Sequence, residues 1–161
     1  MADFRQAYID MLAASPYIVS LARKGATIID MENYTYEVVL GSALAPLNSG
    51  TTLTAQLVTQ GDSDFVLESL STCVNLTPDT DMSFNKNILL QIQDLNTGKF
   101  FFPDSTPMAL ASGQGGAPFI FVAPRVISPN GTLNFSVTNR DLSTNYNQFF
   151  IAMQGIKLYY A

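Results

Sequence analysis

The sequence predicts an all-β protein: an antiparallel β-sandwich or jelly roll of about eight strands, with a short helical segment at the N-terminus. Two observations support this prediction. Apolar and polar residues alternate over many short runs, and the side chains of a strand point to opposite faces with a period of two. Clusters of Gly, Pro, Asn and Ser separate these runs at regular intervals, as they do in sandwich proteins.

The N-terminal residues 1–26 are predicted to form a helical arm, and residues 27–161 a β-sandwich domain. Asp3 suits the N-cap of a first helix, because its carboxylate accepts hydrogen bonds from free backbone N–H groups. The apolar residues of this helix recur at i, i+4, i+7 and i+8, which places them on one face. They are Phe4, Tyr8, Met11 and Leu12.

A second short helix is predicted to begin at Pro16, because proline fits the first helical turn while the residue before it is driven out of the helical region. Gly25 ends this helix, whose apolar residues include Tyr17, Ile18 and Leu21. Two arrangements would bury the apolar faces of these helices: the helices pack on their own β domain, or they dock on a neighbouring subunit. Under the second arrangement the apolar residues of both helices are candidate partner-binding residues.

The predicted strands follow in chain order, each with alternating side chains and each bounded by turn residues. In one of them, Leu133, Phe135 and Val137 alternate with polar residues. The turn before it contains Asn130-Gly131, and both residue types tolerate the positive φ of a tight turn. The full set of predicted strands comprises residues 27–40 (as one strand or two), 51–59, 65–74, 88–93, 99–102, 119–122, 133–138 and 148–160.

Residues 94–102 are predicted to form a hairpin turn followed by an aromatic strand. The aromatic run 100–102 is too apolar for a strand with one wet face, so at least one of its side chains is expected to be buried. Residues 103–117 are predicted to form a long loop, and loops of this length usually carry function or contact partners. Three residues of this loop are therefore further candidates for partner binding: Met108, Leu110 and Gln114.

The charge content is low, since charged residues make up 13% of the chain, about half of the ~25% typical of soluble domains. Such a surface is covered either by uncharged polar residues or partly by partner subunits. The net charge of −5 disfavours nucleic acid and anionic membrane surfaces as partners. No apolar run approaches the ~20 residues of a membrane-spanning helix.

The chain contains no histidine and a single cysteine, Cys73. Ser-His-Asp and Cys-His mechanisms and histidine zinc sites are therefore excluded, and we expect neither an enzyme nor a bound cofactor. Cys73 is expected to be a buried small side chain rather than a nucleophile. The pairs Asp62/Asp64 and Asp79/Asp81 have a spacing that can hold calcium, but further ligands are missing, so solvated turns are expected instead.

The second half of the chain carries a recurring order of turns and strands. A strand is followed by Asp94 and Thr97-Gly98, an aromatic run and a Gly/Pro loop, and a closing strand contains Gly155-Ile156-Lys157-Leu158. Between them lie Pro124, Pro129-Asn130-Gly131 and Asn139. In this order, residues 65–160 resemble small jelly-roll structural proteins of tailed bacteriophages. The first 60 or so residues carry no such resemblance.

This resemblance implies a structural protein of a virion. The leading expectation is a capsid cement or decoration protein, made in the cytoplasm of a bacterial host, that lies on the capsid surface. It would bridge subunits of the major capsid protein or contact other virion proteins, and would self-associate as a dimer or trimer. The alternative is a carbohydrate- or receptor-binding jelly-roll module of a phage tail, neck or fibre, for which Tyr and Asn are available but Trp is absent.

Overall fold

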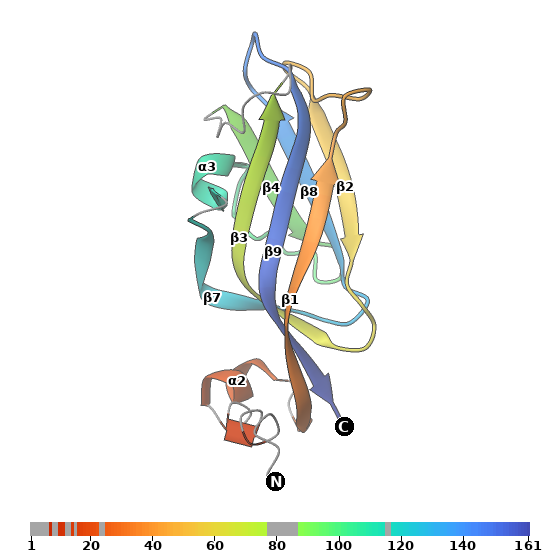
Figure 1. The fold of residues 1–161 in the computed structure, drawn as a ribbon, viewed down its shortest axis with the longest axis vertical. Helices are drawn as coiled ribbons and strands as arrows, with labels where there is room; N and C mark the ends of the chain where they lie inside the picture. The colour runs from red at the N-terminus through yellow and green to blue at the C-terminus, as the bar shows by residue number, and fades with distance from the viewer. Residues whose placement is uncertain are drawn as a thin grey trace.

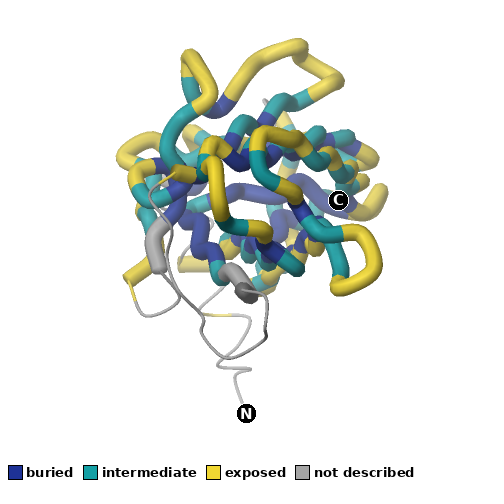
Figure 2. Tube along the Cα trace, turned by 90° about the horizontal axis from the view of Figure 1, so that it is seen from above, coloured by how far each residue is buried: buried dark blue, intermediate teal, exposed yellow. Residues whose placement is uncertain are grey.

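The computed structural model describes residues 7, 10, 11, 14, 16–22, 25–76, 87–114 and 117–161. Two β-sheets pack face to face, with buried residues between them and exposed residues in the loops (Figure 1, Figure 2). The strands are β1 (Ile28–Leu40), β2 (Thr52–Val58), β3 (Asp64–Leu76), β4 (Ile88–Asp94), β5 (Thr106–Pro107), β6 (Gly113–Gln114), β7 (Phe119–Ile127), β8 (Thr132–Asn139) and β9 (Tyr146–Tyr160). The helices are α2 (Pro16–Leu21) and α3 (Met108–Ala111).

The strand order is that of a jelly roll. One sheet runs β1-β9-β3-β6, with β7 also paired to β3, and the other runs β2-β8-β4-β5. With the two-residue β6 set aside, β1-β9-β3-β7 faces β2-β8-β4-β5, and most consecutive strands lie in opposite sheets. Two interleaved Greek keys produce this order, which defines the jelly roll. The predicted all-β fold with a short helical segment is therefore confirmed.

The core lies between the sheets and follows directly from the alternation in the sequence. In β8, Leu133, Phe135 and Val137 are fully buried, while the residues between them are half-exposed. Phe149 and Ile151 of β9 are equally buried in the same cluster. Each of these side chains contributes roughly 1.5–3 kcal/mol by leaving water, so the two central strands anchor the fold.

Helix α2 packs on the outer face of the first sheet, at the end where the C-terminus lies (Figure 1). Ile18 is only 4% exposed and forms a small second core with Val66 and Leu158. Leu21 and Met31 are half-buried at its margin. The apolar face of this helix is therefore covered, at least in part, by its own chain.

The run 99–102, predicted as a strand, does not form one, because only the isolated bridge between Gln93 and Phe100 pairs it to β4. The three consecutive phenylalanine side chains lie in three different environments and do not alternate between two faces as in a strand. Phe101 is buried, Phe102 stacks on Phe121, and Phe100 stays exposed. The expectation that at least one of the three is buried is thus confirmed.

The stretch 103–117, predicted as a loop, contains β5, α3 and β6. Met108 explains why this stretch has regular structure, because its side chain is buried in the main core and anchors α3 there. The hydroxyl of Ser112, also buried, donates to the Met108 carbonyl at 2.9 Å and lies 2.9 Å from the Thr72 hydroxyl of β3. The burial of one apolar side chain thus stabilises a short helix inside a Gly- and Pro-rich stretch.

Candidate functional site

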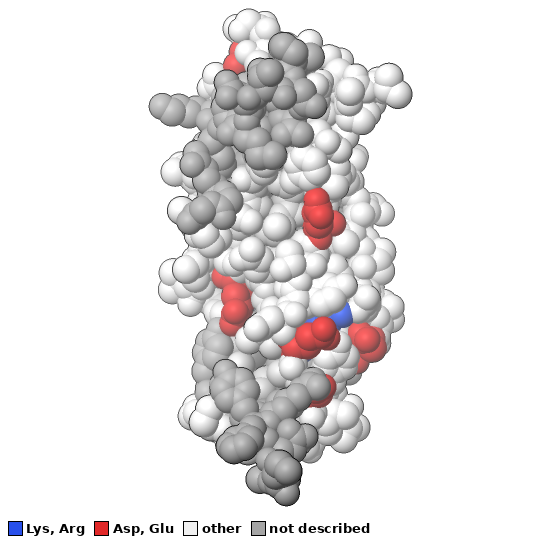
Figure 3. Space-filling model, viewed as in Figure 1, with Lys and Arg blue, Asp and Glu red and all other residues white. Residues whose placement is uncertain are grey.

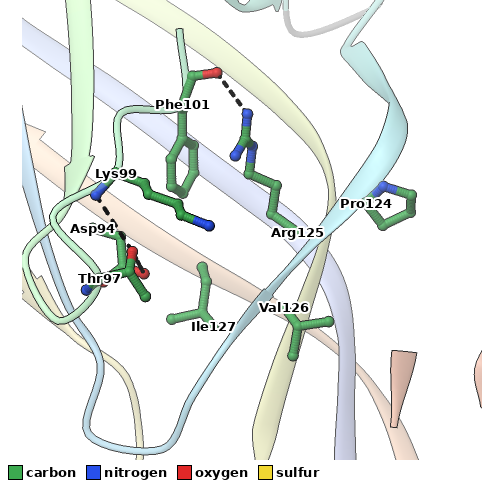
Figure 4. A pocket seen from close by; sticks show the side chains of 8 residues that line it. All are labelled: Asp94, Thr97, Lys99, Phe101, Pro124, Arg125, Val126 and Ile127. Carbon is green, nitrogen blue, oxygen red and sulfur yellow. Dashed lines mark hydrogen bonds between the residues drawn. The ribbon is translucent and has the colours of Figure 1, made fainter. Parts of the chain in front are cut away.

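The jelly roll is hollowed at one flank, where the turn after β4 meets the end of β7. The cavity there has a volume of about 240 Å³ and lies between this turn and β7 (Figure 4). Buried Phe101 and Ile127 contribute to its lining. The residues that line it are Asp94, Thr97, Lys99, Phe101, Pro124, Arg125, Val126 and Ile127.

The turn of residues 94–98 positions the first charged group of this cavity. The Asp94 carboxylate accepts hydrogen bonds from the Asn96 N–H at 2.9 Å and the Thr97 hydroxyl at 2.7 Å, which closes the turn. Gly98 follows with φ of 70°, a conformation that favours glycine. The chain then presents Lys99, whose ammonium end extends into the space facing Arg125 (Figure 4).

Arg125 enters the cavity from β7 and is held in place at two points. Its guanidinium donates to the Phe101 carbonyl oxygen at 2.9 Å. The same group lies over the Phe101 ring, with Cζ 5.2 Å from the ring centroid, a cation–π distance. These contacts leave other N–H groups of the guanidinium for a ligand, in an orientation that is already set.

The charge of this cavity contrasts with the rest of the surface. On the face formed by β3, β9 and β1, most of the surface is uncharged, and the charged groups that appear are almost all carboxylates (Figure 3). Among residues 25–76, 87–114 and 117–161, the basic side chains are Lys99, Arg125, Arg140 and Lys157, and Lys157 is buried. Two of the three basic side chains outside the core therefore line one cavity.

A second cavity, of about 520 Å³, lies at the loop end of the sandwich and has no charged lining residue. The loops around it are tied together: the Ser49 N–H donates to the Asn145 side chain at 3.0 Å, and the Ser49 hydroxyl donates to the Asp141 carbonyl at 2.6 Å. The lining residues are Ala43, Pro46, Ser143, Thr144, Asn145 and Asn147. Leu44 and Leu142 project from these loops, 99% and 92% exposed.

Lys157, buried near the other end of the sandwich, has a structural environment. Its ammonium lies 3.6 Å from the centroid of the Tyr34 ring and donates to the side-chain oxygen of Gln60. The backbone N–H of Gln60 in turn donates to the Tyr36 hydroxyl at 3.0 Å. Lys157 thus links the last strand to the loop after β2, with its charge stabilised by aromatic faces.

The structure separates the candidate partner-binding residues chosen from sequence. Leu110 on α3 is 68% exposed and Met11 is 61% exposed, so both side chains are accessible. Met108 is 1% exposed and Ile18 4% exposed, so as surface contacts these two choices are corrected: they pack inside their own chain. Leu21 is half-buried beside Ile18.

The remaining candidates cannot be placed by their side chains. Phe4, Tyr8 and Leu12 lie outside the described residues. Tyr17 in α2 and Gln114 in β6 are described by their backbone only.

The carboxylate pair at the start of β3 is not the solvated turn expected from sequence. Asp62 is exposed and accepts a hydrogen bond from the Ser63 hydroxyl at 2.9 Å, whereas Asp64 is 2% exposed. Within the described ranges, no group of three or more His, Cys, Asp or Glu side chains is placed to hold a metal ion. Asp79 and Asp81 lie outside those ranges.

Cys73 lies in β3 and is half-buried rather than buried, which corrects the expectation from sequence. Its partial burial raises the pKa of the thiol above its ordinary value. A thiol with a raised pKa carries less thiolate and is less nucleophilic at neutral pH.

Among the helices that the structure describes, none is long and apolar enough to cross a membrane.

Comparisons with known proteins give structural neighbours of low similarity. The structure of infectious bursal disease virus Gx strain is similar to this chain with a TM-score of 0.36 and 8% identity over 83% of this chain and 33% of that one. The infectious bursal disease virus VP2 subviral particle gives 0.32, with 10% identity over 82% of this chain and 33% of that one. An exo-β-1,3-galactanase from Phanerochaete chrysosporium gives 0.27, with 10% identity over 76% of this chain and 27% of that one.

This chain therefore spans about a third or less of the length of these neighbours. No protein-family model matches the sequence, and no curated protein matches it. The strand order of the described residues establishes the fold: within them, the chain forms an eight-stranded jelly roll with a short extra strand and a helix packed on its outer face.

Proposed function

We propose that this chain is a structural protein of a virion, and specifically a capsid cement or decoration protein that bridges subunits of the major capsid protein. The observation that carries the proposal is the display of exposed apolar side chains at two separate places on one jelly roll. One is the loop end, with Leu44 and Leu142, and the other is the flank strand β7, with Ile120 and Val122. A bridging protein requires two such surfaces, because it contacts two neighbours at once.

The apolar surface of β7 results from a break in its pairing. Leu67 of β3 pairs with Arg125 and Ser69 pairs with Ile120, so Glu68 alone stands opposite residues 121–124. Extra residues in one strand form a bulge, which redirects the side chains around it. Ile120 is 70% exposed and Val122 fully exposed, while Phe121 between them packs inward on Phe101.

The apolar tips at the loop end stand on an ordered base. Leu47 and Tyr146 exchange backbone hydrogen bonds of 2.8 and 3.1 Å, which tie the loop after β1 to the start of β9. The Ser49 contacts to Asn145 and Asp141 add to this tie. Because these loops are already held, docking Leu44 and Leu142 on a partner loses less conformational entropy.

The first test is the number of copies per particle, measured by quantitative mass spectrometry of purified virions of the source. A cement protein is expected in a fixed ratio to the major capsid protein. A copy number of the order of ten per particle would assign the chain to the tail or neck instead. Absence from washed particles would reject the virion role altogether.

The second test addresses the two surfaces directly, with particles that lack the protein. Leu44→Ser/Leu142→Ser and Ile120→Ser/Val122→Ser are each expected to abolish rebinding while leaving the circular dichroism spectrum unchanged. Thr54→Ser/Gln56→Ser, which changes exposed polar residues of β2, serves as the matched control. Rebinding of both apolar variants at full affinity would contradict the bridging proposal.

A second candidate function is favoured by the uncharged cavity at the loop end, whose Ser, Thr and Asn side chains suit the hydroxyl groups of a neutral sugar. The chain would then be a carbohydrate- or receptor-binding module of a tail, neck or fibre. Reproducible hits on a glycan array that disappear with Thr144→Val would support this function. An empty array would leave the cement role as the better explanation.

A further inference from the structure

We propose that the flank cavity between the turn 94–98 and β7 is a binding site for a carboxylate, and that its ligand class is a single acidic sugar of the hexuronate type. This proposal is independent of the virion role, since it rests only on the residues that line the cavity. The first argument for a negatively charged ligand is electrostatic. Lys99 and Arg125 come from different elements and meet at one opening, in a chain whose net charge is −5.

Arg125 provides the specific contact for a carboxylate. A guanidinium offers N–H donors in a planar fork that matches the two oxygens of a carboxylate. The fork here is pre-oriented, because one nitrogen already donates to the Phe101 carbonyl and the group rests on the Phe101 ring. Binding therefore needs little reorganisation of this side chain. Lys99 adds a second positive charge from the exposed side of the cavity.

Asp94 explains why the site favours a sugar acid over a simple anion. Its Oδ1 accepts from the Asn96 and Thr97 N–H groups, whereas its Oδ2 accepts only from the Thr97 hydroxyl and has further acceptor capacity. A carboxylate acceptor and the nearby Thr97 hydroxyl suit the hydroxyl groups of a sugar. They are unfavourable for sulfate, because sulfate has no proton to donate to Asp94 and adds a second negative charge beside it.

Size and apolar lining restrict the ligand further. The volume of about 240 Å³ is smaller than the roughly 300–1,000 Å³ of pockets for drug-sized ligands, so it suits one sugar ring rather than a chain of them. Phe101 and Ile127 line the same cavity, and their side chains offer apolar contacts for the C–H face of a ring (Figure 4). The two basic groups, the Asp94 acceptor, the small volume and the apolar lining together suit a ligand with one carboxylate, several hydroxyl groups and a small apolar face.

The experiment titrates the full-length protein with D-glucuronate, D-glucose, acetate and inorganic phosphate by isothermal calorimetry or NMR at low ionic strength. Glucuronate is expected to bind about tenfold or more tighter than glucose, which lacks the carboxylate, and tighter than acetate and phosphate, which lack the hydroxyl pattern. Equal binding of glucuronate and glucose would overturn the proposal. So would tighter binding of phosphate.

Variants locate the site. Lys99→Gln changes an exposed residue and is expected to weaken glucuronate binding about tenfold without changing the urea midpoint. Arg125→Lys keeps the charge but loses the fork, so it is expected to weaken binding as well. Arg140→Gln removes the same charge at the opposite end of the sandwich and is expected to have no effect. An equal loss with Arg140→Gln would show non-specific attraction and reject the site.

A final titration distinguishes a sugar ligand from a protein ligand, since an aspartate side chain also carries a carboxylate. N-acetyl-aspartate amide is titrated beside glucuronate on the same protein. Weaker binding of the amide supports the sugar assignment. Tighter binding of the amide would overturn it and identify the cavity as the receptor for an acidic residue of a neighbouring protein.

Discussion

Gly155 illustrates how a single residue decides whether three strands can lie side by side. It sits in β9 between Tyr34 of β1 and Leu67 of β3, next to the point where the register of β3 shifts. A Cβ at this position would overlap the Val66 carbonyl oxygen and lie 2.9 Å from its carbon. Both obstacles are backbone atoms in a paired strand, so neither can move aside without breaking the ladder.

Gly155→Ala is therefore expected to destabilise the protein by about 3 kcal/mol or more, or to prevent folding. Gly98→Ala is the matched control, because Gly98 has φ of 70° and open space around it, so only the backbone conformation opposes the change. That cost is about 1 kcal/mol. Urea unfolding of both variants measures the difference, and equal losses would contradict the steric argument.

The fold raises the pKa of two tyrosine hydroxyls strongly. Burial first, and the charge of Asp141 second, raise the pKa of Tyr146 to about 12. Burial, and then the hydrogen bond that its hydroxyl donates to Glu32, raise the pKa of Tyr159 to about 12. In both cases the folded pKa exceeds the ordinary value near 10, so the fold favours the neutral phenol.

The stability that these tyrosines contribute is fully present below pH 10 and is lost as the pH rises towards 12. The unfolding free energy should therefore fall steadily over this range. Tyr146→Phe removes one of the two groups with a raised pKa, so the unfolding free energy of this variant should fall less steeply in alkali than that of the wild type. Urea midpoints from pH 8 to 12 test this, and identical slopes would reject it.

At the scale of elements, Ile18 is the most deeply buried of the described side chains of α2. Ile18 is 4% exposed against Val66 and Leu158, whereas the next residue, Val19, is 56% exposed. Ile18→Ala is expected to lower the unfolding free energy by about 2 kcal/mol or more. Val19→Ala, an adjacent truncation on the other face, should change it by less than about 0.5 kcal/mol. Equal effects would mean that α2 does not pack on the sheet in solution.

The elements differ in how far sequence reasoning predicts them, for physical reasons. β4 and β8 have one buried face, so their period of two is visible in the sequence and their limits are predicted to within two residues or so. The run 100–102 is apolar at every position, and periodicity carries no information there. Met108 anchors α3 through a long-range contact with the core, which no local pattern reveals.

The candidate site was also beyond the reach of local patterns. Lys99 follows β4 whereas Arg125 lies in β7, and only the jelly-roll topology brings these two strands of different sheets to one opening. The apolar tips Leu44 and Leu142 lie in loops that look merely polar and glycine-rich in the sequence. A cation or a leucine in a loop has no periodicity to reveal its neighbours, so these residues become recognisable only in the folded chain.

At the scale of the whole molecule, the exposed apolar side chains lead to an expectation for self-association. The bridging proposal includes a homodimer or homotrimer, with Leu44 and Leu142 or Ile120 and Val122 at the contact. Multi-angle light scattering at several concentrations should then give a mass of two or three times 17.5 kDa. One of the two double serine variants should return the mass to that of a monomer. A monomer at every concentration would remove self-association from the proposal.

The bulge in β7 has a consequence for what happens when many copies are crowded together. A flat, continuous outer strand is a template on which identical chains stack into fibrils, and a chain with few charges has little repulsion to prevent this. In β7 the displaced residues 121–124, which include Pro124, interrupt that template near its middle. The free edge of β7 should therefore remain unavailable for such stacking even when the protein is concentrated.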